Sequence, residues 1–119
     1  MGRSVLVVDD DASFRNLAAR ILTSWGHDVV GEAGSVAEAM SQIRELRPDT
    51  VLVDIVLPDG NGFQLTTQLS TLAWRPQVVL ISSDSDPAYG TEAGRVGASG
   101  FCPKAELSGL RLRRLIAEA

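Results

Sequence analysis

The sequence has only one cysteine and one histidine. The single cysteine, Cys102, excludes an internal disulfide and any metal site built from several thiolates, and it fits a reducing, intracellular setting. The single histidine, His27, falls in a predicted surface loop, and we do not interpret it as a phospho-carrier. Chemistry that depends on several cysteines is therefore excluded.

The sequence also lacks an excess of positive charge and any long apolar run. Its formal net charge is −4 at pH 7, so we expect no direct binding of nucleic acid. No apolar run approaches the roughly 18 residues of a membrane-spanning helix. The N-terminal residues MGRSVLVVDD do not have the layout of a signal peptide. We therefore expect a cytoplasmic protein without membrane contacts.

Apolar runs that alternate with amphipathic stretches are what the sequence does contain. With 119 residues, 45% of them hydrophobic and 22% charged, the chain is expected to form one globular domain, residues 1–119. The predicted strands cover residues 4–8, 28–32, 50–53, 77–81 and 99–102. Apolar residues at helical spacing predict helices over about 12–25, 36–46, 63–72, 87–96 and 107–116.

The order of these elements predicts the fold class. A strand followed by a helix, five times over with short connections, requires right-handed crossovers and a parallel sheet between two layers of helices. Strands without polar alternation suit such a sheet, because both of its faces are covered. We predict an α/β fold, a doubly wound five-stranded sheet of the flavodoxin-like order 2-1-3-4-5.

Polar side chains stand where the predicted strands end. Asp9 and Asp10 follow the first strand, Asp54 the third, Ser82 the fourth and Lys104 the fifth. In the predicted order the first and third strands are neighbours, so their carboxylates should converge. Two carboxylates about 4 Å apart repel by roughly 4 kcal/mol at an effective dielectric constant near 20, so the cluster needs protons, solvent or a cation. Oxygen ligands of this kind favour Mg²⁺.

Four short motifs, in order along the chain, resemble the receiver domain of two-component response regulators, including the chemotaxis regulators. These motifs are Val7-Val-Asp-Asp10, Val53-Asp-Ile-Val-Leu-Pro-Asp-Gly-Asn-Gly62, Leu80-Ile-Ser-Ser83 and Phe101-Cys-Pro-Lys104. The resemblance covers essentially the whole chain. It implies a domain that catalyses only its own phosphorylation and dephosphorylation.

The resemblance also implies an acceptor and a metal site. Asp54 corresponds to the phosphoacceptor, which forms an acyl phosphate. Asp10 corresponds to a direct Mg²⁺ ligand, and Asp9 to one that acts through water. Asp54 itself and the backbone carbonyl of Val56 would complete the ligands from the protein.

Three further residues match the family's switching apparatus. Ser82 corresponds to the hydroxyl that hydrogen-bonds the phosphoryl oxygens, and Lys104 to the lysine that pairs with them. Phe101 corresponds to the aromatic residue that turns inward on activation, although a plain core role stays open. Ala105 departs from the family, which usually has proline after this lysine.

The resemblance implies partners as well. A sensor histidine kinase or a phosphotransfer protein would supply the phosphoryl group. Phosphorylation would then change an output surface made of the fourth helix, the fifth strand and the fifth helix, and would favour a homodimer.

Three other functions compete with this interpretation. A phosphatase of the haloacid-dehalogenase type needs a second aspartate two residues after Asp54, where this chain has Val56. A flavin-phosphate binder needs hydrogen-bond donors after the first strand, where this chain has acids that repel phosphate. A receiver-like interaction module that works without phosphorylation stays open as the alternative.

Overall fold

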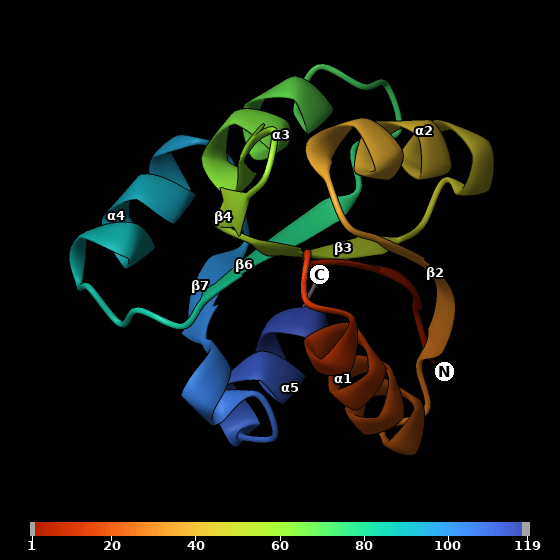
Figure 1. Ribbon diagram of the computed structural model, residues 1–119, viewed down its shortest axis with the longest axis vertical. Helices are drawn as coiled ribbons and strands as arrows, with labels where there is room; N and C mark the ends of the chain where they lie inside the picture. The colour runs from red at the N-terminus through yellow and green to blue at the C-terminus, as the bar shows by residue number, and fades with distance from the viewer. Residues whose placement is uncertain (1, 118–119) are drawn as a thin grey trace.

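The computed structural model describes residues 2–117, in which strands and helices alternate along the chain (Figure 1). The strands are β1 (Ser4–Val8), β2 (Asp28–Ala33), β3 (Thr50–Asp54), β4 (Val56–Leu57), β5 (Gly60–Asn61), β6 (Gln77–Ser82) and β7 (Gly100–Pro103). The helices are α1 (Ala12–Ser24), α2 (Val36–Leu46), α3 (Gly62–Leu69), α4 (Ala88–Arg95), the short 3-10 helix η1 (Lys104–Glu106) and α5 (Leu110–Ala117). Among these residues, no helix is both long enough and apolar enough to span a membrane.

The main sheet has five strands in the order β2-β1-β3-β6-β7, and every neighbouring pair is parallel. Since β6 and β7 are the predicted fourth and fifth strands, this is the predicted order 2-1-3-4-5. The prediction of a doubly wound sheet is confirmed. A small antiparallel hairpin of β4 and β5 was not predicted, because strands of two residues are too short to show a periodic pattern. It lies between the predicted third strand and the predicted third helix.

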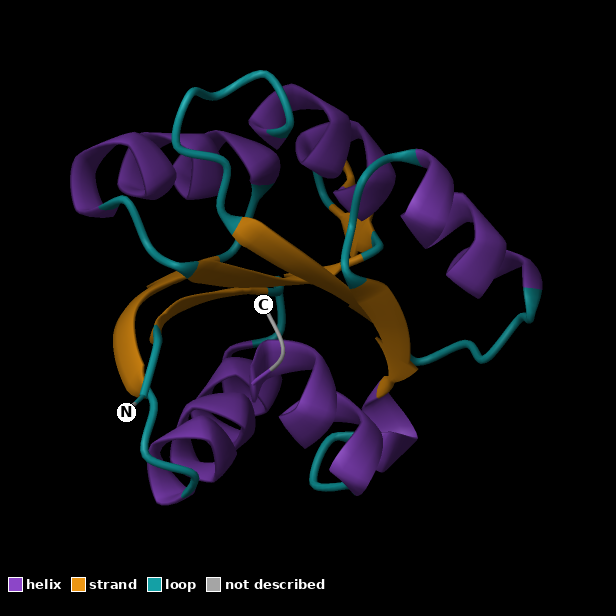
Figure 2. Cartoon of the chain, turned by 180° about the vertical axis from the view of Figure 1, so that it is seen from behind, coloured by secondary structure: helices purple, strands orange, loops and turns teal. Residues whose placement is uncertain are grey.

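Helices cover both faces of the sheet. Figure 2 shows α2, α3 and α4 on one side and α1 and α5 on the other. Side chains along β1 alternate between the two cores: Leu6 and Val8 pack on the side of α2, α3 and α4, whereas Val5 and Val7 pack on the side of α1 and α5. Because successive side chains of a strand point to opposite faces, a strand between two cores needs apolar residues at every position.

Polar side chains satisfy the first backbone N–H groups of α1 and α2. Asp11 caps α1 and accepts a hydrogen bond from the backbone N–H of Ser13 at 2.9 Å. The Ser35 hydroxyl caps α2 and accepts a hydrogen bond from the backbone N–H of Glu38 at 3.1 Å. Both helices therefore begin where the sequence indicated.

The turn after β3 is tied to a distant helix. The Asp59 carboxylate accepts hydrogen bonds from the backbone N–H groups of Val36 at 2.7 Å and Ala37 at 3.0 Å. These are otherwise unpaired donors at the start of α2. Asp59 thereby anchors the hairpin of β4 and β5, which directly follows the carboxyl end of β3.

Candidate functional site

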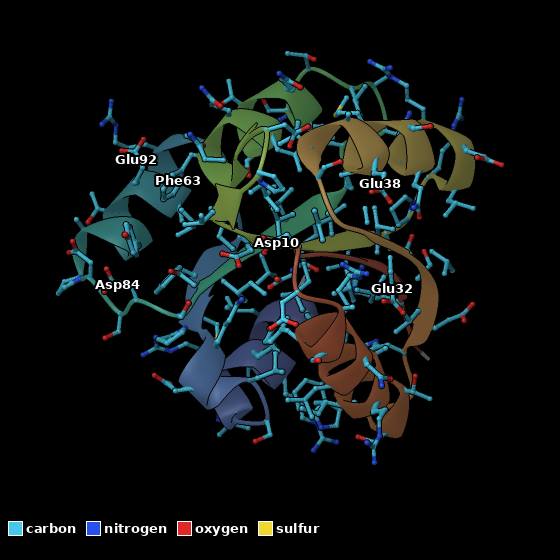
Figure 3. All side chains as sticks on the ribbon, viewed as in Figure 1. Asp10, Glu32, Glu38, Phe63, Asp84 and Glu92 are labelled. Carbon is cyan, nitrogen blue, oxygen red and sulfur yellow. The ribbon has the colours of Figure 1, made fainter. Side chains whose placement is uncertain are left out.

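Three aspartates gather at the carboxyl ends of β1 and β3. These strands pair in parallel, with Val8 beside Val53, so the residues that follow them come close together. Carboxylate oxygens of Asp9, Asp10 and Asp54 all lie within 4.8 Å of one another. Asp9 and Asp54 are buried, whereas Asp10 is exposed and lies near the centre of the view in Figure 3. The structure thus brings together the three acids that the sequence singled out.

The Lys104 side chain bridges two of these acids. Its Nζ lies 2.6 Å from Oδ2 of Asp9 and 2.8 Å from Oδ2 of Asp54, and its side chain is 18% exposed. Lys104 begins η1 directly after β7, and Ala105 continues that turn. A partly buried ammonium group therefore reaches the acids from the carboxyl end of β7, the edge strand of the sheet. It balances one of the three negative charges.

The pKa values follow this imbalance of charge. Burial raises the pKa of Asp9, and the nearby Asp54 charge raises it further, against the lowering effect of Lys104 and the backbone N–H of Asp11. Burial by itself lowers the pKa of Lys104, but its hydrogen bonds to Asp54 and Asp9, together with their charges, outweigh burial and raise it. The two acids therefore favour the charged form of Lys104, whereas Lys104 offsets only part of the cost of burying a charge on Asp9.

The acidic cluster fits a hard divalent cation. All of its donors are oxygens, and it keeps excess negative charge after Lys104 is counted. Oδ2 of Asp9 is buried, and the Lys104 ammonium group lies 2.6 Å from it. Val56 lies in β4, where its backbone N–H donates to Oδ1 of Asp54 at 3.0 Å.

Ser82 and Phe101 lie in the neighbouring strands. Ser82 is the buried last residue of β6, and its hydroxyl accepts a hydrogen bond from the backbone N–H of Asp84 at 3.0 Å. Phe101 is half-buried in β7, and its ring meets that of Tyr89 in α4 edge-on, with centroids 5.5 Å apart. Ser82 thus stands at the same sheet edge as the acids, whereas Phe101 packs between β7 and α4.

The sequence did not assign a site role to two residues near Asp9. The Arg15 guanidinium donates to the backbone carbonyl of Asp9 at 2.6 Å and pairs with Glu32 at 3.1 Å. The Phe14 ring lies against the Lys104 ammonium group, 4.3 Å from ring centroid to Nζ. Phe14 was counted only as part of an apolar helix face. No local signal indicates these contacts, because the partners come from other elements.

A family model identifies the family to which this fold belongs. Residues 5–116 match the model of the response regulator receiver domain. The chain belongs to this family. Receiver domains act in two-component signalling that depends on phosphorylation, and they interact with histidine kinases or phosphotransfer proteins. The resemblance drawn from the four motifs is confirmed.

Similar proteins and a similar solved structure support the same assignment. The chain is 35% identical to the chemotaxis protein CheY of Thermotoga maritima over 104 residues, which is 87% of each protein. It is 40% identical to the DNA-binding transcriptional activator DevR/DosR of Mycobacterium tuberculosis, over 98% of this chain but only 53% of that protein. A solved signal receiver domain of the putative response regulator NarL from Mycobacterium tuberculosis matches with a TM-score of 0.84 and 32% identity, over 96% of both chains.

Proposed function

We propose that this receiver domain, residues 1–119, accepts a phosphoryl group on Asp54 in a His-Asp phosphorelay. The observation that carries the proposal is the Lys104 ammonium group, which lies against both Asp9 and Asp54 within a cluster of three acids. Asp54 ends a central strand and is anchored by the backbone N–H of Val56. Its carboxylate therefore combines a fixed position with a cation beside it, as phosphoryl transfer requires.

The transfer forms one bond and breaks another. A carboxylate oxygen of Asp54 attacks the phosphorus of a phosphohistidine on a sensor kinase or phosphotransfer protein. The bond between phosphorus and the imidazole nitrogen breaks, and its electron pair stays on that nitrogen. The product is an aspartyl phosphate, an acyl phosphate. Lys104 and the hydroxyl of Ser82 bind its new oxygens and offset their charge.

The residues that would hold Mg²⁺ are Asp10 directly, Asp9 through water, Asp54, and the backbone carbonyl of Val56. When bound, the ion supplies positive charge that offsets the charge of the phosphoryl oxygens. The oxygen-only donor set and the negative charge that remains after Lys104 is counted support this assignment. Arg15 holds the Asp9 backbone from the other side through its 2.6 Å hydrogen bond.

The phosphoryl group changes the charge around Asp54 and so acts as a switch. The phosphoryl group carries between about 1.5 and 2 negative charges, in place of the single charge of the carboxylate, and it brings three acceptor oxygens. To donate to these oxygens, the Ser82 hydroxyl turns toward Asp54 and gives up its hydrogen bond from Asp84, which frees the loop before α4. Phe101 then packs further inward. The output surface of α4, β7 and α5 changes shape and favours a homodimer.

The domain catalyses only its own phosphorylation and dephosphorylation, and we place it in the cytoplasm. We propose no direct contact with nucleic acid or membrane, in keeping with the net charge of −4. The alternative is an interaction module that has this fold but works without phosphorylation.

The first experiment addresses Asp54 directly. The protein is incubated with Mg²⁺ and acetyl phosphate, and its intact mass is measured, with Asp54→Asn and a chelator as controls. We expect a phosphoryl adduct that is lost in both controls. If acetyl phosphate fails, Mg²⁺ and beryllofluoride are titrated as a mimic of the phosphoryl group. No response to either reagent would refute the phosphoacceptor role and favour the interaction module.

A further inference from the structure

The Lys104 ammonium group contacts two acids and one aromatic ring. Its Nζ lies 2.6 and 2.8 Å from oxygens of Asp9 and Asp54. The Phe14 ring also lies against it, 4.3 Å from ring centroid to Nζ. Phe14 belongs to the first turn of α1, is half-buried, and packs against the core between the sheet, α1 and α5. A rigid ring anchored in the core therefore borders the cation of the site.

An aromatic ring does more for a cation than an aliphatic side chain of similar size. The negative face of the ring attracts an ammonium group within about 6 Å of the centroid, and the attraction grows when water is excluded. Lys104 meets both conditions, because its side chain is only 18% exposed. A leucine at this position would keep apolar packing but lose the electrostatic attraction. The ring therefore limits where the flexible lysine can hold its charge.

We propose that Phe14 is a positioning residue for phosphoryl transfer, whose ring holds the Lys104 ammonium group in place beside Asp54. This inference rests on the proposed role of Asp54 as phosphoacceptor. A donor that is already in place stabilises the transferring group without having to reorganise during the reaction. Weakening the ring's attraction should therefore slow transfer even where the fold is unchanged.

The test replaces Phe14 with mono-, di- and trifluorophenylalanine, which weaken the negative face of the ring stepwise with little change in size. The rate of phosphorylation by acetyl phosphate with Mg²⁺ is measured for each protein. We expect a stepwise fall that reaches about threefold to tenfold for the trifluoro ring and for Phe14→Leu. The same substitutions at Phe63, whose ring lies against Tyr89 at 6.1 Å, serve as the matched control and should leave the rate unchanged.

A second measurement tests the contact without phosphorylation. In the metal-free protein, the ring current of Phe14 should shift the proton resonances of the Lys104 side chain upfield, and Phe14→Leu should remove that shift. A protein that phosphorylates Asp54 at the same rate across the whole fluorinated series would overturn the role of Phe14 alone. A wild-type protein that accepts no phosphoryl group would overturn the proposed function, and this inference with it.

Discussion

Gly62 begins α3 at a point where its backbone passes close to the strand that carries Asp54. A Cβ atom added at Gly62 would lie 2.8 Å from the backbone oxygen of Asp54, 2.9 Å from Cδ2 of Leu80 and 3.1 Å from Cα of Ile55. Ordinary contacts of a Cβ atom begin near 3.4 Å. Two of the three neighbours are backbone atoms, which cannot move without displacing the end of β3. The Gly62→Ala variant is therefore expected to strain the phosphoacceptor's own strand.

Two opposing effects set the size of this change. Replacing glycine by alanine within a helix normally stabilises a protein by about 0.5–1 kcal/mol, because the unfolded chain loses freedom. Forcing an extra carbon into a packed site costs about 1–3 kcal/mol. Because the clash at Gly62 involves backbone, the cost lies toward the upper end of that range. We expect Gly62→Ala to lower the free energy of unfolding by about 1–2 kcal/mol.

Equilibrium unfolding in urea, followed by the fluorescence of Trp25 and Trp74, measures this difference, because Trp74 packs against one core and Trp25 against the other. The chain offers matched controls in Gly90 and Gly94 of α4, where an added Cβ meets nothing within 4 Å. Alanine at either position should raise the free energy of unfolding by about 0.5–1 kcal/mol. If Gly62→Ala is as stable as the wild type while the controls gain stability, the steric argument is wrong.

Two further predictions concern Cys102 and Asp59. Burial raises the pKa of the Cys102 thiol to about 11, so iodoacetamide at pH 8 should label native protein far more slowly than urea-unfolded protein; equal rates would refute this. Hydrogen bonds from the backbone N–H groups of Val36 and Ala37 lower the pKa of Asp59, so Asp59→Ala should destabilise the protein at pH 7. Urea unfolding measures the difference in free energy of unfolding between the wild type and Asp59→Ala. This difference should shrink as the pH falls from about 3.9, the pKa of an unfolded aspartate, through the lower pKa of folded Asp59. A difference that stays constant with pH would contradict the prediction.

The sequence predicted the strands and their order well, because patterns of apolar residues report directly on burial. The runs that became β1, β3 and β6 are apolar at nearly every position, and each packs against both cores. Since parallel strands end at one edge of a sheet, the same patterns placed Asp9, Asp54 and Lys104 together. The ends of elements were less certain: the third helix, predicted to about residue 72, ends at Leu69.

Contacts between remote elements could not be predicted in this way. Asp59 falls between the predicted third strand and third helix, and only the folded chain shows that it caps α2. Phe14 was part of an apolar helix face, and only the packing of α1 beside η1 sets its ring against Lys104. Residue patterns along the chain thus determined the fold and the chemical groups of the site. Tertiary structure decided which groups touch, because those distances depend on how helices pack across the sheet and not on local sequence.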